Sequence, residues 1–459
     1  MNRKPAFNVT RRKTVANGWI AAVAAVVLGA PAVASAQPGS GATPITLADA
    51  IRDSIAHSTQ IKEAQANYLV ARARTGQNAS RQLPQLGFSV NASQFDDRTT
   101  VTLPGSTTPF ELAPNNQEAL TIAITQDLDV SGQLGLIVSQ ARLNARSAEY
   151  EVQAVSADQK LATTLAYYAV LRAEQNVLVA QADLEAYKQQ QTTTTRLYTG
   201  GVGQRIDVYR ADSQVAEAES EVVRRQNELN SARSTLNDTL GRPLDQPLKL
   251  VDPTLSGQVD LGDGATESTR PQLIAKALMR RPEALEATVE VLAANKGIQV
   301  AQRSSSPGLS LSLSGTHNPT TSFEAPREDV GTLTLSLSIP IFDGGFAREK
   351  VNEARSLVNS AKAREDRIRR DIALQVQNAA LDVETARKRE IAARAELEAA
   401  IAARKLAQQR FESQVGLYIE VTDAQSALTA AQAAKVQATY DLLTARAQLA
   451  HALNDPLDK

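Results

Sequence analysis

The chain has 459 residues, with 49 basic and 50 acidic side chains and a formal net charge of −1, so no basic excess points to a nucleic-acid partner. It contains no cysteine, which excludes a disulfide framework, a thiolate metal site and a lipid-anchored cysteine. Aromatic residues make up 4% of the chain, a low share for one large globular core.

The N-terminal segment has the features of a secretory signal peptide. Five basic residues precede an apolar run from Trp19 to Ala30, and Ala34-Ser35-Ala36 then gives a small-x-small cleavage pattern. We predict that residues 1–36 are removed on export, and the Arg11-Arg12 pair leaves the Sec and twin-arginine routes open. No later stretch has 18 consecutive apolar residues, so the sequence predicts no membrane-spanning helix in the mature chain.

The segment after this peptide predicts a helix followed by two strands. The helix begins near Thr46, can break near Ser58 and stops before Pro84, which cannot continue it. Residues 85–94 and 118–128 change to a two-residue period, with apolar side chains on one face and small or polar ones on the other. A polar loop with three prolines joins them. The apolar positions are Leu86, Phe88, Val90, Leu120, Ile122 and Ile124.

A long helix over 131–199 is the most strongly patterned part of the first half. Its apolar residues step by four and three in alternation, which is the pattern of a coiled-coil seam. At 1.5 Å per residue such a helix reaches roughly 100 Å, too long for a globular domain. A return helix is predicted over 207–240, where Gly241-Arg242-Pro243 ends it. The seam begins with Leu134, Val138, Ala141, Ala145, Ala148, Val152 and Val155.

The second half of the chain repeats the first. Residues 241–270 are rich in Gly, Pro and Asp and predict a linker between the repeats 37–250 and 271–459. At one offset of 213 positions, Val202-Gly203 falls on Val415-Gly416. Such a repeat predicts two copies of one structural unit. The second copy has a predicted helix over 271–303, strands over 308–316 and 331–340, a long helix over 344–413 and a return helix over 420–453.

Four strands cannot seal themselves from lipid. Alternation over about ten residues is typical of outer-membrane barrel strands, although a soluble sandwich also produces it. The chain has no further strands for a sandwich, and single-chain membrane barrels begin at about eight strands. We therefore predict a mainly α fold with a small β part, in which duplicated long helical hairpins form a periplasmic α-barrel. Four strands per chain would contribute to a trimeric, 12-stranded outer-membrane β-barrel. The aromatic girdle has as candidates Phe88, Phe95, Phe110 and Phe323.

Two motifs carry a resemblance to a known family. One is Ile339-Pro340-Ile341-Phe342-Asp343-Gly344-Gly345 at a strand-to-helix joint, and the other spans Arg410 to Gln425 at the second helical turn. Together with the duplicated strands and hairpins, they make the chain resemble the TolC-type outer-membrane factor family over nearly all of its mature length. The resemblance implies a homotrimeric channel in the outer membrane of a Gram-negative bacterium, in contact with outer-membrane lipid and extending into the periplasm. It also implies a periplasmic adaptor and an inner-membrane RND or ABC pump as partners.

The resemblance further implies a gate at the far helical tips. Glu420 and Asp423 would ring the narrow end, where converging carboxylates favour cations. Asp207 and Arg210 occupy the equivalent positions of the first repeat and could pair across the tip. Asp207 has a structural alternative as the N-cap of the returning helix.

The tip hinge would use glycines on both turns. The expected hinge residues are Tyr198, Gly200, Gly201, Gly203, Phe411 and Gly416. Gln414 stands where the first copy has Gly201, so a left-handed turn is costlier there and we predict a differently shaped second tip. Family members that latch this tip with a tyrosine and an arginine would place them at Phe411 and Gly416, so that particular latch is not predicted.

No Walker loop, HExxH motif or nucleophile elbow occurs in the sequence, so neither an enzyme nor a cofactor is predicted. The histidines, His57, His317 and His451, are far apart, and no metal site is predicted. We predict a passive exit duct for small molecules such as drugs, metals or other toxicants. The same architecture would serve a type I protein secretion system, and a periplasmic adaptor or coiled-coil scaffold is the alternative from another class.

Overall fold

The computed structural model describes residues 44–97, 99–102, 104–105, 109–252, 269–319 and 327–457. The chain divides into two units, Met1–Ala42 and Thr43–Lys459, and all described residues belong to the second. The predicted signal peptide and Phe323 therefore lie outside the described residues, as does most of the predicted linker.

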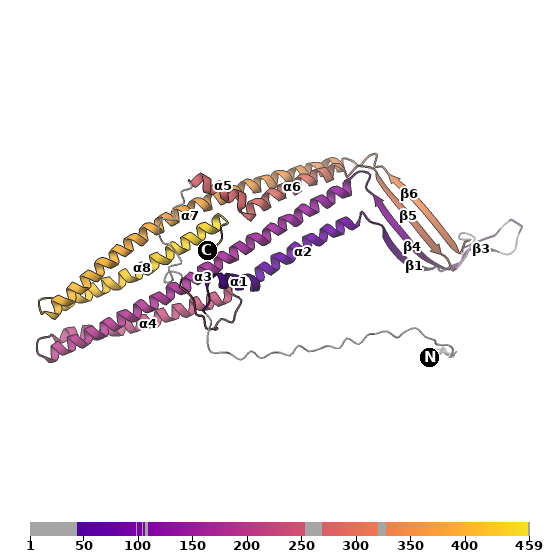
Figure 1. Cartoon of the computed structure of the whole chain (residues 1–459). Helices are drawn as coiled ribbons and strands as arrows, with labels where there is room; N and C mark the ends of the chain where they lie inside the picture. The colour runs from indigo at the N-terminus through magenta and orange to yellow at the C-terminus, as the bar shows by residue number, and fades with distance from the viewer. Residues whose placement is uncertain are drawn as a thin grey trace, which may run out of the picture. The chain divides into compact units, whose positions relative to one another are not determined.

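Long helices dominate the described part of the chain, with a small sheet at one end (Figure 1). This confirms the predicted mainly α fold with a small β part. The first half contains α1 (Leu47–His57), α2 (Thr59–Ser80), β1 (Gln85–Gln94), β4 (Asn116–Leu128), α3 (Gln133–Thr199) and α4 (Arg205–Thr239). The second half contains α5 (Arg270–Arg280), α6 (Pro282–Gln302), β5 (Gly308–His317), β6 (Asp329–Ser338), α7 (Phe346–Glu412) and α8 (Tyr418–Ala452).

Two details differ from the sequence predictions. A short ribbon of β2 (Thr99–Val101) and β3 (Phe110–Ala113) forms where the sequence predicts only a loop. The helix predicted over 271–303 is interrupted at Arg281, whose extended backbone (ψ 129°) precedes Pro282. A residue before proline is pushed out of the helical region by the ring, so α5 ends there and α6 begins with Pro282.

The sheet has the order β1-β4-β5-β6, and every neighbouring pair is antiparallel. Its register places Phe88 opposite Ile122, Ile124 opposite Leu313 and Leu311 opposite Leu335, so the large apolar side chains share one face. The other face carries small polar residues, among them Thr121 and Thr316, whose hydroxyls lie 3.1 Å apart. The apolar face is nevertheless exposed, since Leu86 is 73% and Leu335 64% accessible.

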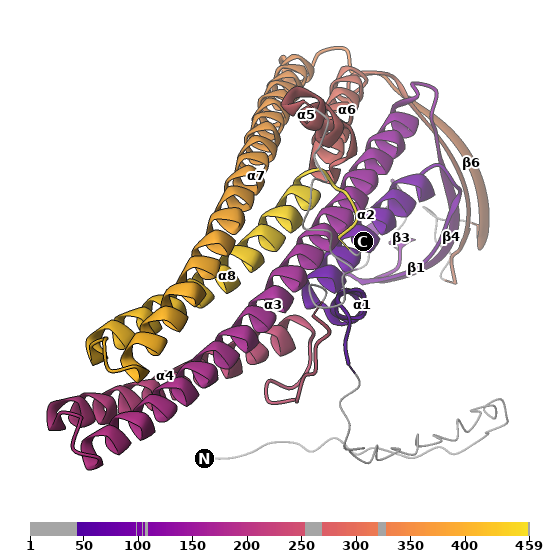
Figure 2. The ribbon, with the colours of Figure 1, turned by 60° about the vertical axis from the view of Figure 1, so that its left-hand side comes forward.

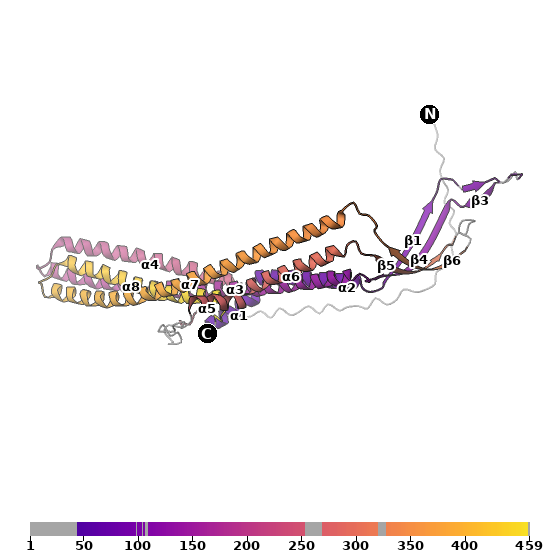
Figure 3. The same ribbon diagram turned by 90° about the horizontal axis from the view of Figure 1, so that it is seen from above.

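The helices also lie side by side in rows of four, in an order that matches the four strands of the sheet. In the helical tier next to the sheet, α2 packs on α3, α3 on α6 and α6 on α7. In the tier farther from the sheet, α4 packs on α3, α3 on α8 and α8 on α7. Figures 2 and 3 show α3 and α7 running through both tiers, with the shorter helices beside them. The strand tier and the two helical tiers therefore have matching orders, with a first-repeat edge and a second-repeat edge.

An apolar core fills the junction between the two helical tiers, which we call the equator. Tyr167 and Val170 of α3 pack there with Leu236 at the end of α4 and Leu443 of α8. The Tyr167 hydroxyl lies 2.7 Å from the Val251 carbonyl and accepts a hydrogen bond from the Val251 amide (3.1 Å). Burial raises the pKa of Tyr167 to about 12, so the hydroxyl stays protonated and can donate. Among the described helices, none is both long and apolar enough to cross a bilayer.

Candidate functional site

The first helical tip is a glycine-dependent turn between α3 and α4. The amides of Val202 and Gly203 both donate to the Leu197 carbonyl, at 3.0 and 2.9 Å. Gly201 has a left-handed backbone (φ 78°), as a Schellman helix ending requires. A Cβ on Gly203 would lie 2.7 Å from the Tyr198 nitrogen, so the close return of the chain requires glycine there.

The second tip, between α7 and α8, has the same hydrogen-bond scheme. The amides of Val415 and Gly416 both donate to the Arg410 carbonyl at 3.0 Å. Gln414 adopts the left-handed backbone with φ 61°. The prediction of a differently shaped second tip is therefore wrong. The turn geometry is fixed by its hydrogen bonds and by Gly416, where a Cβ would lie 3.0 Å from the Phe411 nitrogen. Gln414 bears a strain of about 1–2 kcal/mol as a result.

Replacing Gln414 with glycine is expected to increase the local stability of the second tip. Relief of the left-handed strain outweighs the extra chain entropy of glycine by about 0.5 kcal/mol. Amide exchange at Val415 and Gly416 should therefore slow about twofold. Gly201→Gln is the reciprocal variant and should speed exchange at the matching amides of the first tip. Faster exchange in Gln414→Gly would contradict the strain assigned to this residue.

Two of the carboxylates expected at the gate, Asp207 and Glu420, lie in the first turns of the returning helices. Gln204, rather than Asp207, is the N-cap residue of α4, and its side chain makes no capping hydrogen bond. Asp207 is the third residue of α4, within its first turn, and pairs with Arg210 of the same helix (3.5 Å). Glu420 occupies the equivalent position in α8 and pairs across the turn with Arg410 (3.4 Å). Both carboxylates complement the positive ends of their helices.

The remaining predicted residues lie around the same two turns. Asp423 is exposed one turn beyond Glu420 and forms no ion pair with another described residue. The Phe411 ring packs edge-on against Tyr418, with ring centroids 6.0 Å apart. Tyr198 is partly exposed at the end of α3. The structure thus gathers Glu420, Arg410 and the Phe411–Tyr418 pair at one tip, and leaves Asp423 open to solvent.

A set of contacts that the sequence did not predict joins the two hairpins near their tips. The Tyr418 hydroxyl of α8 donates to Gln214 of α4 (2.7 Å). The Asp183 carboxylate of α3 accepts from the Gln425 amide (2.8 Å) and the Thr429 hydroxyl (2.5 Å) of α8. Tyr187 and Ser426 also place their hydroxyls 3.3 Å apart. We call these contacts the inter-hairpin clasp, defined by Asp183, Tyr187, Gln214, Tyr418, Gln425, Ser426 and Thr429.

The clasp is polar although it is well packed. Tyr418 is only 5% accessible, and burial, with the charge of Asp207, raises its pKa to about 12. Gln190, on the same stripe of α3, is 6% accessible, and its Nε2 has no hydrogen-bond partner among the described residues. Toward the equator the seam is apolar, with Val177 and Leu443 in the core. Polar residues at seam spacing on α8, from Tyr418 through Gln425 to Thr429, were the signal that could have indicated this contact.

Comparison with known proteins identifies the family. The family model for outer membrane efflux proteins matches residues 50–242 and 273–455, one match in each half of the chain. The chain therefore belongs to the outer membrane efflux protein family. Family membership places it in the outer membrane of a Gram-negative bacterium, from which it extends into the periplasm, as a channel rather than an enzyme.

Individual relatives agree with this assignment. Protein CyaE of Bordetella pertussis is 26% identical over 363 residues, which cover 78% of this chain and 73% of CyaE. The structure of CusC superimposes with a TM-score of 0.77 at 18% identity, covering 92% of this chain and 96% of CusC. The outer-membrane channel OprN gives a TM-score of 0.75 at 21% identity, covering 90% of this chain and 91% of OprN. At these identities the two structures support the fold alone.

Proposed function

We propose that three copies of this chain form the passive exit duct of a tripartite efflux system. Small molecules such as drugs, metals or other toxicants would arrive from an inner-membrane RND or ABC pump through a periplasmic adaptor. The single observation that carries the proposal is the open row of four elements, with matching orders in the strand tier and both helical tiers.

Open edges make the isolated chain unsuitable for a bilayer. Within the described sheet, β1 and β6 each pair on one side only, so each leaves a row of backbone groups without a partner. Unpaired backbone groups cannot face hydrocarbon, and only a closed barrel removes both edges. Two copies would supply eight strands, whose barrel interior is about filled by side chains, whereas three supply twelve and leave a lumen.

The two faces of the sheet suit this assembly. Exposed Leu86, Phe88 and Leu335 on one face would meet lipid. The opposite face, with Thr121 and Ser312, would line water. In mild detergent the chain should run as a heat-labile species of three times its own mass, and a solely monomeric species would contradict the assembly.

We further propose that the helical tips form the selective end of the duct. Three chains would bring Glu420 and Asp423 together near one axis, where carboxylates favour cations. Because Glu420 already pairs with Arg410, the open carboxylate of Asp423 should carry the larger share of the selectivity.

Asp423→Ala is therefore expected to lower the cation preference of the reconstituted channel, and Glu420→Ala with Asp423→Ala should lower it further. The measurement is the reversal potential across a bilayer that separates two salt concentrations. Glu396→Ala, an exposed carboxylate elsewhere on α7, is the control and should change nothing. An unchanged reversal potential in the double variant would contradict the proposal that Glu420 and Asp423 surround the channel axis.

Cells can test the cargo class directly. A strain without the chain should accumulate small-molecule toxicants, and the intact chain should restore their export. If the strain instead keeps normal small-molecule levels and loses secreted proteins, the duct of a type I secretion system is the correct function. Cross-linking in such cells, followed by identification of the inner-membrane partner, distinguishes an RND from an ABC pump.

A further inference from the structure

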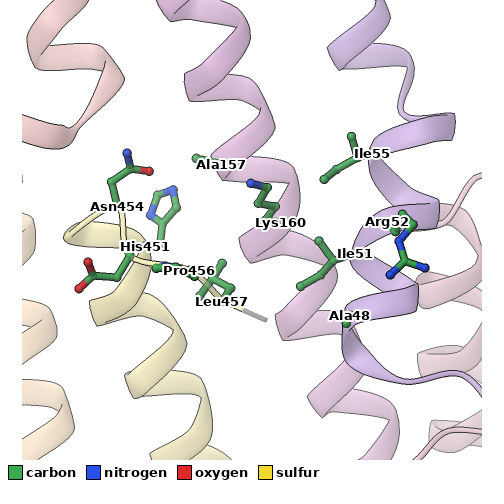
Figure 4. Close-up of a pocket in the computed structure, with 11 residues that line it drawn as sticks. Ala48, Ile51, Arg52, Ile55, Ala157, Lys160, His451, Asn454, Pro456 and Leu457 are labelled. Atoms are coloured by element: carbon green, nitrogen blue, oxygen red, sulfur yellow. The ribbon is translucent and has the colours of Figure 1, made fainter. Parts of the chain in front are cut away.

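A pocket of about 410 Å³, drawn in close-up in Figure 4, lies at the equator. It is a half-open pocket, bordered by α1, by the middle of α3 and by the end of α8 with the segment that follows it. Its apolar lining consists of Ala48, Ile51, Ile55, Ala157, Pro456 and Leu457. Figure 4 shows Ile51 and Ile55 directed from α1 toward α3, so their side chains face the pocket.

The wall formed by the segment after α8 is held in place by specific contacts. Asn454 has a left-handed backbone (φ 52°), and the Asp455 amide donates to the Ala450 carbonyl (2.8 Å), which turns the chain sharply at the helix end. The Asp455 carboxylate then pairs with Lys276 (2.5 Å) and Arg280 (3.1 Å) of α5. These contacts within the chain hold the wall of the pocket in place.

The charges around the pocket leave one cation without a partner. Arg52 pairs with Asp49 (3.1 Å), and His451 contacts Asp158 (3.0 Å). Asp455 is already matched by two cations. Lys160 extends from α3 toward His451 in Figure 4, and no described carboxylate lies within ion-pair distance of its ammonium group.

We propose that this pocket binds an amphipathic carboxylate, of the class of a medium-chain fatty acid. The Lys160 ammonium would donate to the carboxylate, since hydrogen bonds between two charged groups are the strong ones. The aliphatic chain would cover Ile51, Ile55 and Leu457. A volume of this size lies within the range of small-molecule sites, which combine apolar lining residues with a small number of polar groups that orient the ligand. Of the polar lining residues here, Lys160 is the cation that is free to hold a carboxylate.

The position of the pocket gives the ligand a structural consequence. Ile51 and Lys160 belong to the first repeat, whereas His451 and Leu457 belong to the second. A ligand held by both would add contacts between the repeats at the base of the two hairpins. This site is independent of the proposed cargo path, because it needs neither the lumen nor the tips.

The test uses the full chain in lipid nanodiscs and decanoate as the probe, with binding heats corrected against protein-free nanodiscs. Lys160→Gln should weaken decanoate binding about tenfold, the loss expected for one charge-assisted hydrogen bond. It should leave the binding of decanol, which has the same chain and no charge, unchanged. Lys160→Arg keeps the cation and should restore decanoate binding.

Two further variants control for folding and for the apolar part of the site. Lys188→Gln removes a lysine from the same helix that pairs with Glu219 away from the pocket, and should have no effect. Ile55→Trp fills the pocket and should abolish binding of both probes. The proposal is overturned if wild-type chain binds decanoate no better than protein-free nanodiscs do. It is also overturned if Lys160→Gln binds decanoate as the wild type does, or loses decanol equally.

Discussion

The Leu335→Arg variant is expected to form almost no assembled barrel in the outer membrane. Leu335 lies near the middle of β6 on the exposed apolar face, directly opposite Leu311. An arginine on a lipid-facing barrel position near the bilayer centre costs about 2–4 kcal/mol, and a trimer would meet that cost three times. The heat-labile trimer band in purified outer membranes should therefore fall more than tenfold.

The neighbouring residue supplies a matched control. Thr334 precedes Leu335 on β6 but belongs to the opposite face, where it pairs with Ser312. Thr334→Arg introduces the same side chain into the same strand, and there it would face water and be tolerated. If the trimer band is lost in the Thr334→Arg variant and kept in the Leu335→Arg variant, the assignment of the two faces is reversed. If both variants keep the trimer band equally, neither face meets lipid.

The second large effect is expected at the inter-hairpin clasp. Asp183→Ala should increase the single-channel conductance severalfold, because it releases α8 from α3 near the tip. The Asp183 carboxylate accepts two hydrogen bonds from the second hairpin, and Gln425 is itself bound by Arg404 (2.7 Å). Each bond to a charged group contributes about 1.5–3 kcal/mol, so their loss in three chains would shift the tips toward separation.

Asp212 provides the comparison for this variant. Its carboxylate accepts a hydrogen bond from Gln191 (2.7 Å), which belongs to the same hairpin. Asp212→Ala therefore removes a similar bond without breaking any contact between the two hairpins. Conductance should stay at the wild-type value in Asp212→Ala. A common rise in both variants would indicate general loosening of the helices rather than release of the clasp.

The elements of the fold were predictable wherever a pattern is local. The periodicity of apolar residues shows which face of a strand or helix each side chain occupies, and it depends only on neighbouring residues. The alternation around Leu311 and Leu335 and the spacing from Leu134 to Val155 are examples. The β2–β3 ribbon was missed because strands this short carry no measurable period. The break at Pro282 was missed because apolar spacing continues across it, although proline itself was the signal.

The candidate site was predictable only in part. Glycines marked the two turns, since a close chain return permits no side chain at Gly203. The shape of the second turn was mispredicted at Gln414, because its hydrogen bonds impose the backbone conformation regardless of the residue type. The clasp joins residues such as Asp183 and Gln425, 242 positions apart. The polar seam of α8 was visible in the sequence, but the sequence did not indicate which side chains of the other hairpin it would contact.

The unlike edges of the row of four have a consequence for mixed populations of subunits. In the proposed trimer a β1 edge would meet a β6 edge, so the contact would be heterologous and would repeat by rotation until the ring closed on its starting member. A subunit damaged along one edge would still join a neighbour through the other edge. The resulting ring could not close. A minority of damaged subunits would therefore have a dominant-negative effect on complexes built mostly from intact subunits.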